Sequence, residues 1–238
     1  MLVWTDLEAT GLVAAVHDVL EVAVVVTDDR LREVGRFHRV IYSSIAELLV
    51  HLGAGSPRGD FEAGAAATGL DLTVVEMHAR NGLWAESARS PDCLAHVDDQ
   101  LAEFIERTAL VTEEHDGEGE RTSRVVQPQI AGSSIWFDRT LMQVGLPRSL
   151  AQLHYRQVDV TTLVELGRRF WPALHGGQPR KREIHRAMAD VEDSLSLCRY
   201  YAEQVASATG EGPATTRELR GAPPSRDDFT AENRARVE

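Results

Sequence analysis

A run of β-branched residues near the start of the chain constrains the fold most strongly. Residues Val19 to Thr27 read VLEVAVVVT, a composition typical of a buried strand. A short acidic turn leads to the partly alternating segment Leu31 to Tyr42, and the segment Val3 to Leu12 reads as a strand that ends at a Thr-Gly turn. Three strands joined by short turns imply an antiparallel meander.

The rest of the chain alternates helical and strand patterns. Apolar residues recur at intervals of three and four from Leu94 to Ile105, which predicts a core-facing helix. The patterns that follow predict, in order, a strand at Val125 to Ala131, a helix at Trp136 to Val144, a strand at Gln157 to Val160, a helix from the capping-box pair Thr162 and Glu165 to Trp171, and a last helix from Ala187. This order indicates the α/β class, with a ribonuclease H-like mixed five-stranded sheet flanked by helices.

Three segments differ from the domain that we expect to span residues 1–206. Residues 43–69 are rich in Gly and Ala with a weak helical signal, and we interpret them as an insertion or mobile cover. A second insertion is expected near residues 111–128, where the charged stretch Thr112 to Ser123 is typical of a surface excursion. Residues 207–238 contain few large apolar side chains and are expected to form a disordered tail.

The charge of the chain limits its partners. Its 238 residues are enough for one domain with a full core, but a net charge of -12 is unsuited to holding long nucleic acid by its phosphates. A metal-dependent enzyme with a short anionic substrate is still allowed, because bound Mg²⁺ inverts the local field.

Cysteine usage and hydropathy favour the cytoplasm. Cys93 and Cys198 stand alone without metal-ligand spacing, which indicates a reducing compartment and no structural zinc. We find no leader-like region before the first strand and no segment apolar enough to span a bilayer. We therefore expect a cytoplasmic protein with no membrane partner.

Two carboxylates in the first strand suggest a metal site. Asp6 and Glu8 are two residues apart, so both project from the same face of the strand. Like charges this close repel unless a cation lies between them, and oxygen ligands favour Mg²⁺ or Mn²⁺. A solvated acidic face on an edge strand is the alternative for such a short motif.

Two later segments supply further candidate groups. Asp138 lies at a strand-to-helix junction, where it could also simply compensate the helix dipole. His185 and Asp190 flank the start of the last helix, and a separation of five residues points them to different sides of a helix. We therefore place His185 in the approach loop, where a capping or surface role is the alternative, and Asp193 could equally be the functional acid.

These groups together suit phosphodiester hydrolysis. Two metal ions roughly 3.5–4 Å apart generate the attacking hydroxide and stabilise the leaving oxygen. Holding both ions takes about four carboxylates, and a histidine has a suitable pKa for the base.

The pattern of a D-x-E pair, a mid-chain Asp and an H-x4-D pair resembles that of the DEDDh 3′-to-5′ exonucleases. The residues around these positions resemble the oligoribonuclease family in particular. Four stretches match the family pattern in order: Trp4 to Leu12 (WTDLEATGL), Gly132 to Arg139 (GSSIWFDR), His154 to Arg169 (HYRQVDVTTLVELGRR) and His185 to Ser194 (HRAMADVEDS). The resemblance implies a homodimeric exoribonuclease that hydrolyses very short RNA, dinucleotides included, to 5′-mononucleotides.

The resemblance also implies roles for individual residues. Two Mg²⁺ or Mn²⁺ ions would be held by four acids, with His185 as the general base. Tyr155 would come from the partner protomer to stack on a base, which is worth about 1–3 kcal/mol. The full set comprises Asp6, Glu8, Asp138 and Asp190 as metal ligands, Leu12 as a wedge against the bases, His78 near the scissile end, and Ser134, Arg156 and Thr161 around the 5′ phosphate.

Two departures from the family pattern concern substrate length and sugar preference more than the chemistry. Ser133 stands where the family usually has Asn, and the bulky Trp136 stands where it has a small residue. The alternatives are a DEDDh exonuclease on short DNA or on a nucleotide-linked cap, a catalytically silent nucleic-acid-binding homologue, and an acidic domain that binds a protein.

Overall fold

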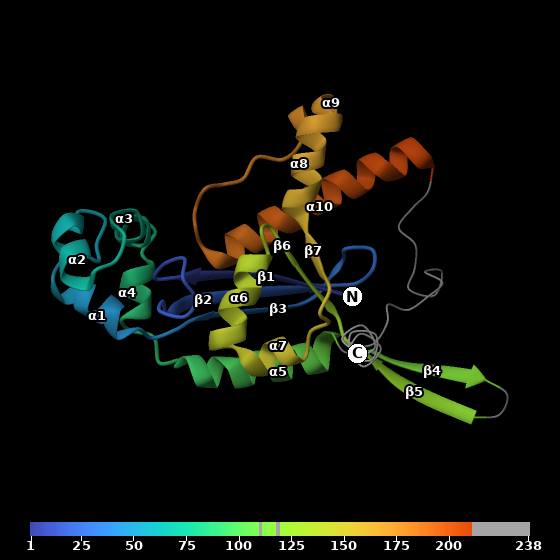
Figure 1. Cartoon of the computed structure of the whole chain (residues 1–238), viewed down its shortest axis with the longest axis horizontal. Coiled ribbons are helices and arrows are strands. Elements are labelled where there is room, and N and C mark those ends of the chain that lie inside the picture. Colours follow the sequence, from blue (N-terminus) through green and yellow to red (C-terminus); the bar gives the residue numbers. More distant parts are fainter. Residues whose placement is uncertain (110, 118–119, 211–238) are drawn as a thin grey trace, which may run out of the picture.

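A computed structural model of the chain describes residues 1–109, 111–117 and 120–210. Its central sheet has the strand order β3-β2-β1-β6-β7 (Figure 1). The strands are β1 (Leu2–Ala9), β2 (Val19–Thr27), β3 (Glu33–Val40), β6 (Gln129–Gly132) and β7 (Gln157–Asp159). Strands β1 to β3 are antiparallel neighbours, whereas β6 runs parallel to β1 and β7 parallel to β6. The predicted α/β fold with a mixed five-stranded sheet is confirmed.

The two faces of the sheet have separate cores. Helices α5 (Leu94–Ala109), α6 (Trp136–Gly145) and α7 (Pro147–Ala151) are on one side, where Val3 and Leu7 of β1 join the core. Trp4 points to the other face and packs in a cluster with Val191 and Leu195 of α10 (Ala187–Thr209). Because side chains alternate along a strand, Asp6 and Glu8 share the face of Trp4. The two carboxylates of β1 therefore lie on the side of the sheet that α10 covers.

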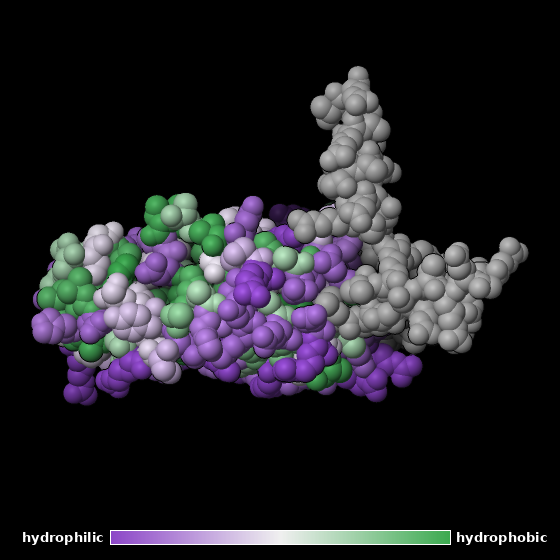
Figure 2. Space-filling view, turned by 90° about the horizontal axis from the view of Figure 1, so that it is seen from below, coloured by the Kyte–Doolittle hydropathy of each residue, from purple (hydrophilic) through white to green (hydrophobic). Residues whose placement is uncertain are grey.

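Residues 43–87 form a helical segment at one end of the sheet (Figure 1). It consists of α1 (Ser44–His51), α2 (Phe61–Thr68), α3 (Leu72–Arg80) and α4 (Leu83–Ser87), which enclose a small core that includes Leu49 and Trp84. In the face drawn in Figure 2, hydrophobic residues are mixed with hydrophilic ones at this end of the molecule.

Residues 43–69, interpreted as an insertion or mobile cover with a weak helical signal, contain the helices α1 and α2. Ser43 and Asp60 cap these helices by accepting bonds from Ile45 N and Ala63 N. Gly64 is a packing residue of α2, because an added Cβ would lie 2.5 Å from the Cβ of Ala54. Close packing therefore accounts for the glycine at this position.

Residues 111–126, part of the stretch predicted to be a surface excursion, contain the two strands of a hairpin. Strands β4 (Val111–Gly117) and β5 (Glu120–Val126) pair in an antiparallel two-stranded sheet of their own (Figure 1). Their register sets Glu113 opposite Arg124 and Asp116 opposite Arg121. Apolar periodicity does not reveal a strand of this kind.

The last helices differ from the predicted bounds. Helix α8 (Val160–Phe170) begins earlier than the capping-box pair suggested, because the Asp159 side chain accepts from Thr161 N at 2.9 Å and caps it. Pro172 begins a further short helix, α9 (Pro172–Gly176).

Helix α10 continues to Thr209 and ends at Gly210, so residues 207–209, predicted to belong to the tail, are helical. The rest of the predicted tail, residues 211–238, lies outside the described residues. Within the described ranges, no helix is both long enough and apolar enough to cross a membrane.

Candidate active site

Three carboxylates meet between β1 and the first turn of α10. One ligand oxygen each of Asp6, Glu8 and Asp190 lies within 4.8 Å of the others. Asp190 is 3% exposed, and the Glu8 side chain is 12% exposed. The strand alternation and the helix start that the sequence predicted therefore bring these acids together.

Asp138 lies beside this cluster in the first turn of α6. It is 5% exposed, and its Oδ1 accepts a hydrogen bond of 2.8 Å from the backbone N–H of Leu7. Leu7 is the residue between Asp6 and Glu8, so this bond holds the Asp138 carboxylate against the part of β1 that contains the two acids. Its charge is the largest raising influence on the pKa of Asp6 after burial. Asp138 is not one of the three acids whose ligand oxygens lie within 4.8 Å of one another.

Burial and mutual repulsion shift the pKa values of these carboxyl groups. Burial, followed by the charge of Asp138, raises the pKa of Asp6 far above its usual value. Burial, followed by Asp190 and Glu21, raises the pKa of Glu8 to about 8. Burial also raises the pKa of Asp138 to about 7, although the Leu7 N–H favours the ionised form. A nearby cation is therefore needed to stabilise the ionised cluster.

Lys181 provides one such positive charge. Its Nζ lies 2.6 Å from Oδ1 of Asp190, and its charge lowers the pKa values of Asp6 and Glu8. Lys181 is the only lysine of the chain. It was not among the candidate residues of the sequence, because the loop that contains it has no periodic pattern.

The oxygen-only donor set of the cluster fits Mg²⁺ or Mn²⁺. Three carboxylate oxygens already lie within reach of a single ion. The raised pKa values of Asp6 and Glu8 show that a cation would favour the ionised forms of these two groups. A cluster without histidine or cysteine does not suit a structural zinc ion.

His185 lies in the loop before α10, with its side chain exposed. Its backbone φ of 52° breaks the helical path, so that His185 and Asp190 leave the chain from different local structures. Asp193, the alternative acid, instead accepts bonds from the N and Nε of Arg182 at 2.9 and 2.7 Å.

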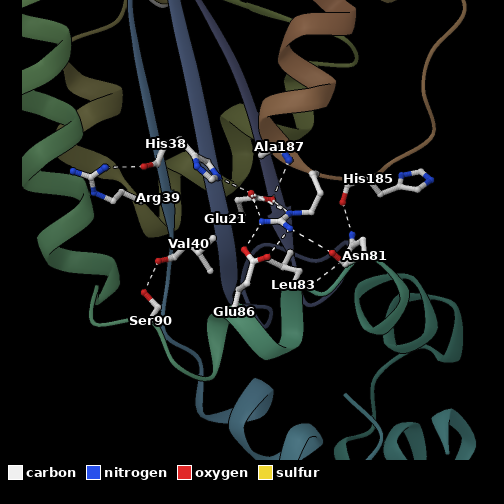
Figure 3. A network of polar contacts seen from close by, with 11 residues as sticks. Glu21, His38, Arg39, Val40, Asn81, Leu83, Glu86, Ser90, His185 and Ala187 are labelled. Atoms are coloured by element: carbon white, nitrogen blue, oxygen red, sulfur yellow. Dashed lines mark hydrogen bonds and ion pairs between the residues drawn. The ribbon is translucent and has the colours of Figure 1, made fainter. Parts of the chain in front are cut away.

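A buried charge network lies next to this loop (Figure 3). Glu21 of β2 is 1% exposed and pairs in register with Glu8. It accepts hydrogen bonds from the Arg186 guanidinium at 3.0–3.2 Å, and its Oε1 lies 2.6 Å from Nε2 of His38. These partners lower the pKa of Glu21 to about 2, although burial alone would raise it. In the sequence this network is indicated only by Glu21 itself, a single charged residue within the apolar run of β2.

The residues assigned to the 5′ phosphate and to base stacking fall into two pairs. Ser134 N donates to Thr161 Oγ1 at 2.9 Å, and the two hydroxyl oxygens are 3.3 Å apart. Arg156 Nε donates to the Tyr155 hydroxyl at 3.1 Å, on the segment before β7. Thus Ser134 and Thr161 are brought together, and Tyr155 and Arg156 contact each other.

The other two predicted substrate residues differ in exposure. Leu12 is 79% exposed in the turn after β1, as a wedge would require. His78 is fully buried, packs edge-on against Trp84, and bonds the Ala9 carbonyl through Nε2 at 3.1 Å. Because a carbonyl only accepts, Nε2 holds the proton, and burial lowers the pKa of His78 to about 4. The buried His78 is connected to the site by its bond to Ala9 and by Glu8, whose Oε2 lies 4.0 Å from His78 Nε2.

The two departures from the family pattern lie near Asp138. Ser133 Oγ is 2.8 Å from Ser194 Oγ of α10, which connects the β6–α6 junction with that helix. Trp136 is 60% exposed and contacts Phe137 edge-on at 5.8 Å. A large aromatic surface is therefore accessible two residues before Asp138.

Solved structures similar to this chain include exonucleases. An exonuclease I from Methylocaldum szegediense aligns with a TM-score of 0.50 at 17% identity, over 85% of this chain and 40% of that chain. An exonuclease I structure without ligand aligns with a TM-score of 0.51 at 13% identity, over 85% of this chain and 42% of that chain. This chain thus spans about two fifths of those proteins, and the likeness concerns the fold.

Similarity to curated sequences extends over nearly the whole chain. No family model matches. An oligoribonuclease of Nocardia farcinica is 32% identical over 215 residues, which are 90% of this chain and 85% of the relative. An oligoribonuclease of Cutibacterium acnes is 33% identical over 217 residues, 91% of each chain. The chain therefore belongs to the oligoribonuclease family of 3′-to-5′ exoribonucleases.

Proposed function

We propose that this protein hydrolyses very short oligoribonucleotides from the 3′ end and releases 5′-mononucleotides. The observation that supports this most directly is the convergence of Asp6, Glu8 and Asp190, with oxygens within 4.8 Å of one another, on one face of the sheet. Family membership supports the class of reaction, and the carboxylate cluster supplies ligands for the divalent ions that such a reaction uses.

The proposal includes two divalent ions, Mg²⁺ or Mn²⁺, held by Asp6, Glu8, Asp138 and Asp190. When bound, such ions generate a hydroxide nucleophile and neutralise the charge that develops on the leaving oxygen. The chain contributes the fixed geometry: β1 presents two of the ligands, and the Leu7 N–H orients Asp138.

His185 would accept the proton of the attacking water. An exposed imidazole is suited to proton transfer near neutrality, and its loop adjoins the helix that presents Asp190.

Recognition of the substrate ends would be divided among exposed and half-buried residues. Leu12 offers an apolar surface at the end of β1 for a base to pack against. Ser134, Thr161 and Arg156 offer hydroxyls and a guanidinium for a 5′ phosphate. Tyr155 would act across a homodimer by stacking on a base in the site of the partner. A 5′ phosphate cap of this kind, together with the net charge of -12, favours short substrates over long ones.

The test is a time course with Mn²⁺ on 5′-phosphorylated RNA of two, five and twenty nucleotides, beside the matching DNA and an EDTA control. We expect rapid release of mononucleotides from the dinucleotide, abolished by EDTA. Digestion of the longer strands alone would contradict the short-substrate proposal and implicate the exposed Trp136 in a different specificity. The absence of any metal-dependent cleavage would contradict the nuclease function itself.

A further inference from the structure

The loop that presents His185 has an unfavourable backbone conformation. Residues 177–186 contain no helix or strand, and two non-glycine residues in them, Glu183 and His185, have φ values of 54° and 52°. Such conformations cost of order 1 kcal/mol each and persist only where the surroundings impose them. Specific contacts must therefore hold this loop in place.

One set of contacts holds the chain directly after His185. The Arg186 guanidinium bonds both oxygens of buried Glu21, and Ala187 N donates to Glu21 Oε2 at 3.0 Å. Arg186 also bonds Glu86 of α4 through Nη1 and Nη2 at 3.0 and 2.6 Å. The arginine thus joins the base of the loop to the sheet and to the helical segment (Figure 3).

A second contact holds His185 itself. Asn81, at the end of α3, donates from Nδ2 to the carbonyl oxygen of His185, and its Oδ1 accepts from Leu83 N at 3.0 Å. The backbone carbonyl of Asn81 accepts from Arg186 Nη1 at 3.4 Å. In Figure 3 the imidazole of His185 points away from this anchor, so that the main chain is held while the ring is free for chemistry.

We propose that Asn81, Arg186 and Glu21 are positioning residues for His185, and that the helical segment of residues 43–87 thereby takes part in catalysis. This inference rests on the proposed role of His185 as the general base. The alternative is that the network only stabilises the fold, since a buried ion pair also joins β2 to α10. The two explanations differ in what happens to His185 when one contact is removed.

Asn81→Asp is the variant that best separates the contact to His185 from the capping of α4. An aspartate keeps the acceptor for Leu83 N, so the start of α4 retains its bond, but it loses the donor and presents a negative oxygen to the His185 carbonyl. We expect kcat to fall by about 10–100-fold, the effect typical of losing a residue that orients a catalytic group. The KM, the affinity for Mn²⁺ and the Tm should change little. Arg199→Gln, which removes bonds to the Leu31 carbonyl elsewhere on α10, is the matched control and should keep the activity of the unmodified protein.

A double-mutant cycle separates positioning from general stabilisation. If Asn81 acts through His185, the variant with both Asn81→Asp and His185→Ala should be no slower than His185→Ala alone, because effects of residues that act as a unit do not add. Fully additive losses would overturn the inference. Arg186→Lys, which keeps the charge but cannot bridge two carboxylates, should retain more activity than Arg186→Gln. Equal losses in those two folded variants would also overturn the role assigned to Arg186.

An NMR measurement keeps this test separate from the test of the proposed function. The Cε1–H resonance of His185, identified by its loss in His185→Ala, reports the environment of the ring without any turnover. We expect this resonance to shift or broaden in Asn81→Asp and to remain unchanged in Arg199→Gln. An unchanged resonance in Asn81→Asp would overturn the positioning, whereas a shifted resonance in a protein without nuclease activity would contradict the proposed function alone.

Discussion

The Nζ atom of Lys181 lies 2.6 Å from Oδ1 of Asp190, so the one lysine of the chain is in contact with the carboxylate cluster. The ammonium group supplies one positive charge where three carboxylate oxygens lie within 4.8 Å of one another. A divalent ion at this place has to compete with that charge.

We therefore expect Lys181→Met to bind Mn²⁺ more tightly than the unmodified protein, by about three- to tenfold, since the lysine is half exposed and its interaction is partly screened. The metal-free variant should also unfold at a lower temperature, because the repulsion among the carboxylates is less compensated. Isothermal titration calorimetry and thermal unfolding in EDTA measure the two effects. Arg180→Met in the same loop is the control, and unchanged or weaker Mn²⁺ binding by Lys181→Met would contradict the competition.

The stability of the metal-free protein should decrease as the pH rises from about 5 to 8.5. The pKa of Glu8 is raised from 4.5 to about 8 and that of Asp138 from 3.8 to about 7. Between the unfolded and folded values the folded state binds more protons, so deprotonation opposes folding. Each tenfold difference in proton affinity between the two states corresponds to about 1.4 kcal/mol.

The Tm measured in EDTA across this pH range checks this expectation, and saturating Mg²⁺ should flatten the profile. Asp138→Asn keeps an acceptor for Leu7 N and should reduce the slope. A metal-free Tm that is constant or that rises over this range would show that these carboxyl groups titrate normally.

Asp6→Asn should abolish nuclease activity and leave the metal-free fold intact or more stable. Burial and repulsion by Asp138, Glu8 and Asp190 disfavour the charged form of Asp6, so neutralising it should raise the free energy of unfolding. Asp193→Asn is the matched control, because Asp193 pairs with the partly exposed Arg182, and its loss should cost only about 0.5–1 kcal/mol with activity retained. Unfolding of Asp6→Asn under these conditions would indicate a structural carboxylate.

The sequence was sufficient for features that depend on local pattern. The bounds of β2 were predicted to the residue, because a strand buried on both faces is a continuous apolar run. Asp6 and Glu8 could be placed on one face from the period of a strand alone. By contrast, Glu21 and Arg186 are 165 positions apart, and nothing local in either segment shows that they pair.

The position of Lys181 and the burial of His78 were not predicted, for a similar reason. Lys181 approaches Asp190 from a loop without any periodicity, and the resemblance to the family placed His78 at the substrate. Its burial depends on packing against Trp84, within a core that the sequence pattern did not reveal. Tertiary contacts of this kind determine whether a side chain is exposed. A sequence pattern gives only the average burial of that residue type.

His78→Ala should therefore act mainly on stability. The imidazole is fully buried, packs on Trp84, and fixes the Ala9 carbonyl at the end of β1, so truncation should cost roughly 2–4 kcal/mol through the cavity and the lost hydrogen bond. Leu12→Ala offers the contrasting case, because a side chain that is 79% exposed contributes little to folding. If Leu12 packs against a substrate base, its truncation should raise the KM for a dinucleotide several-fold without lowering the Tm. Thermal unfolding and steady-state kinetics on both variants distinguish these roles, and a raised KM with an unchanged Tm for His78→Ala would instead place the histidine in contact with the substrate.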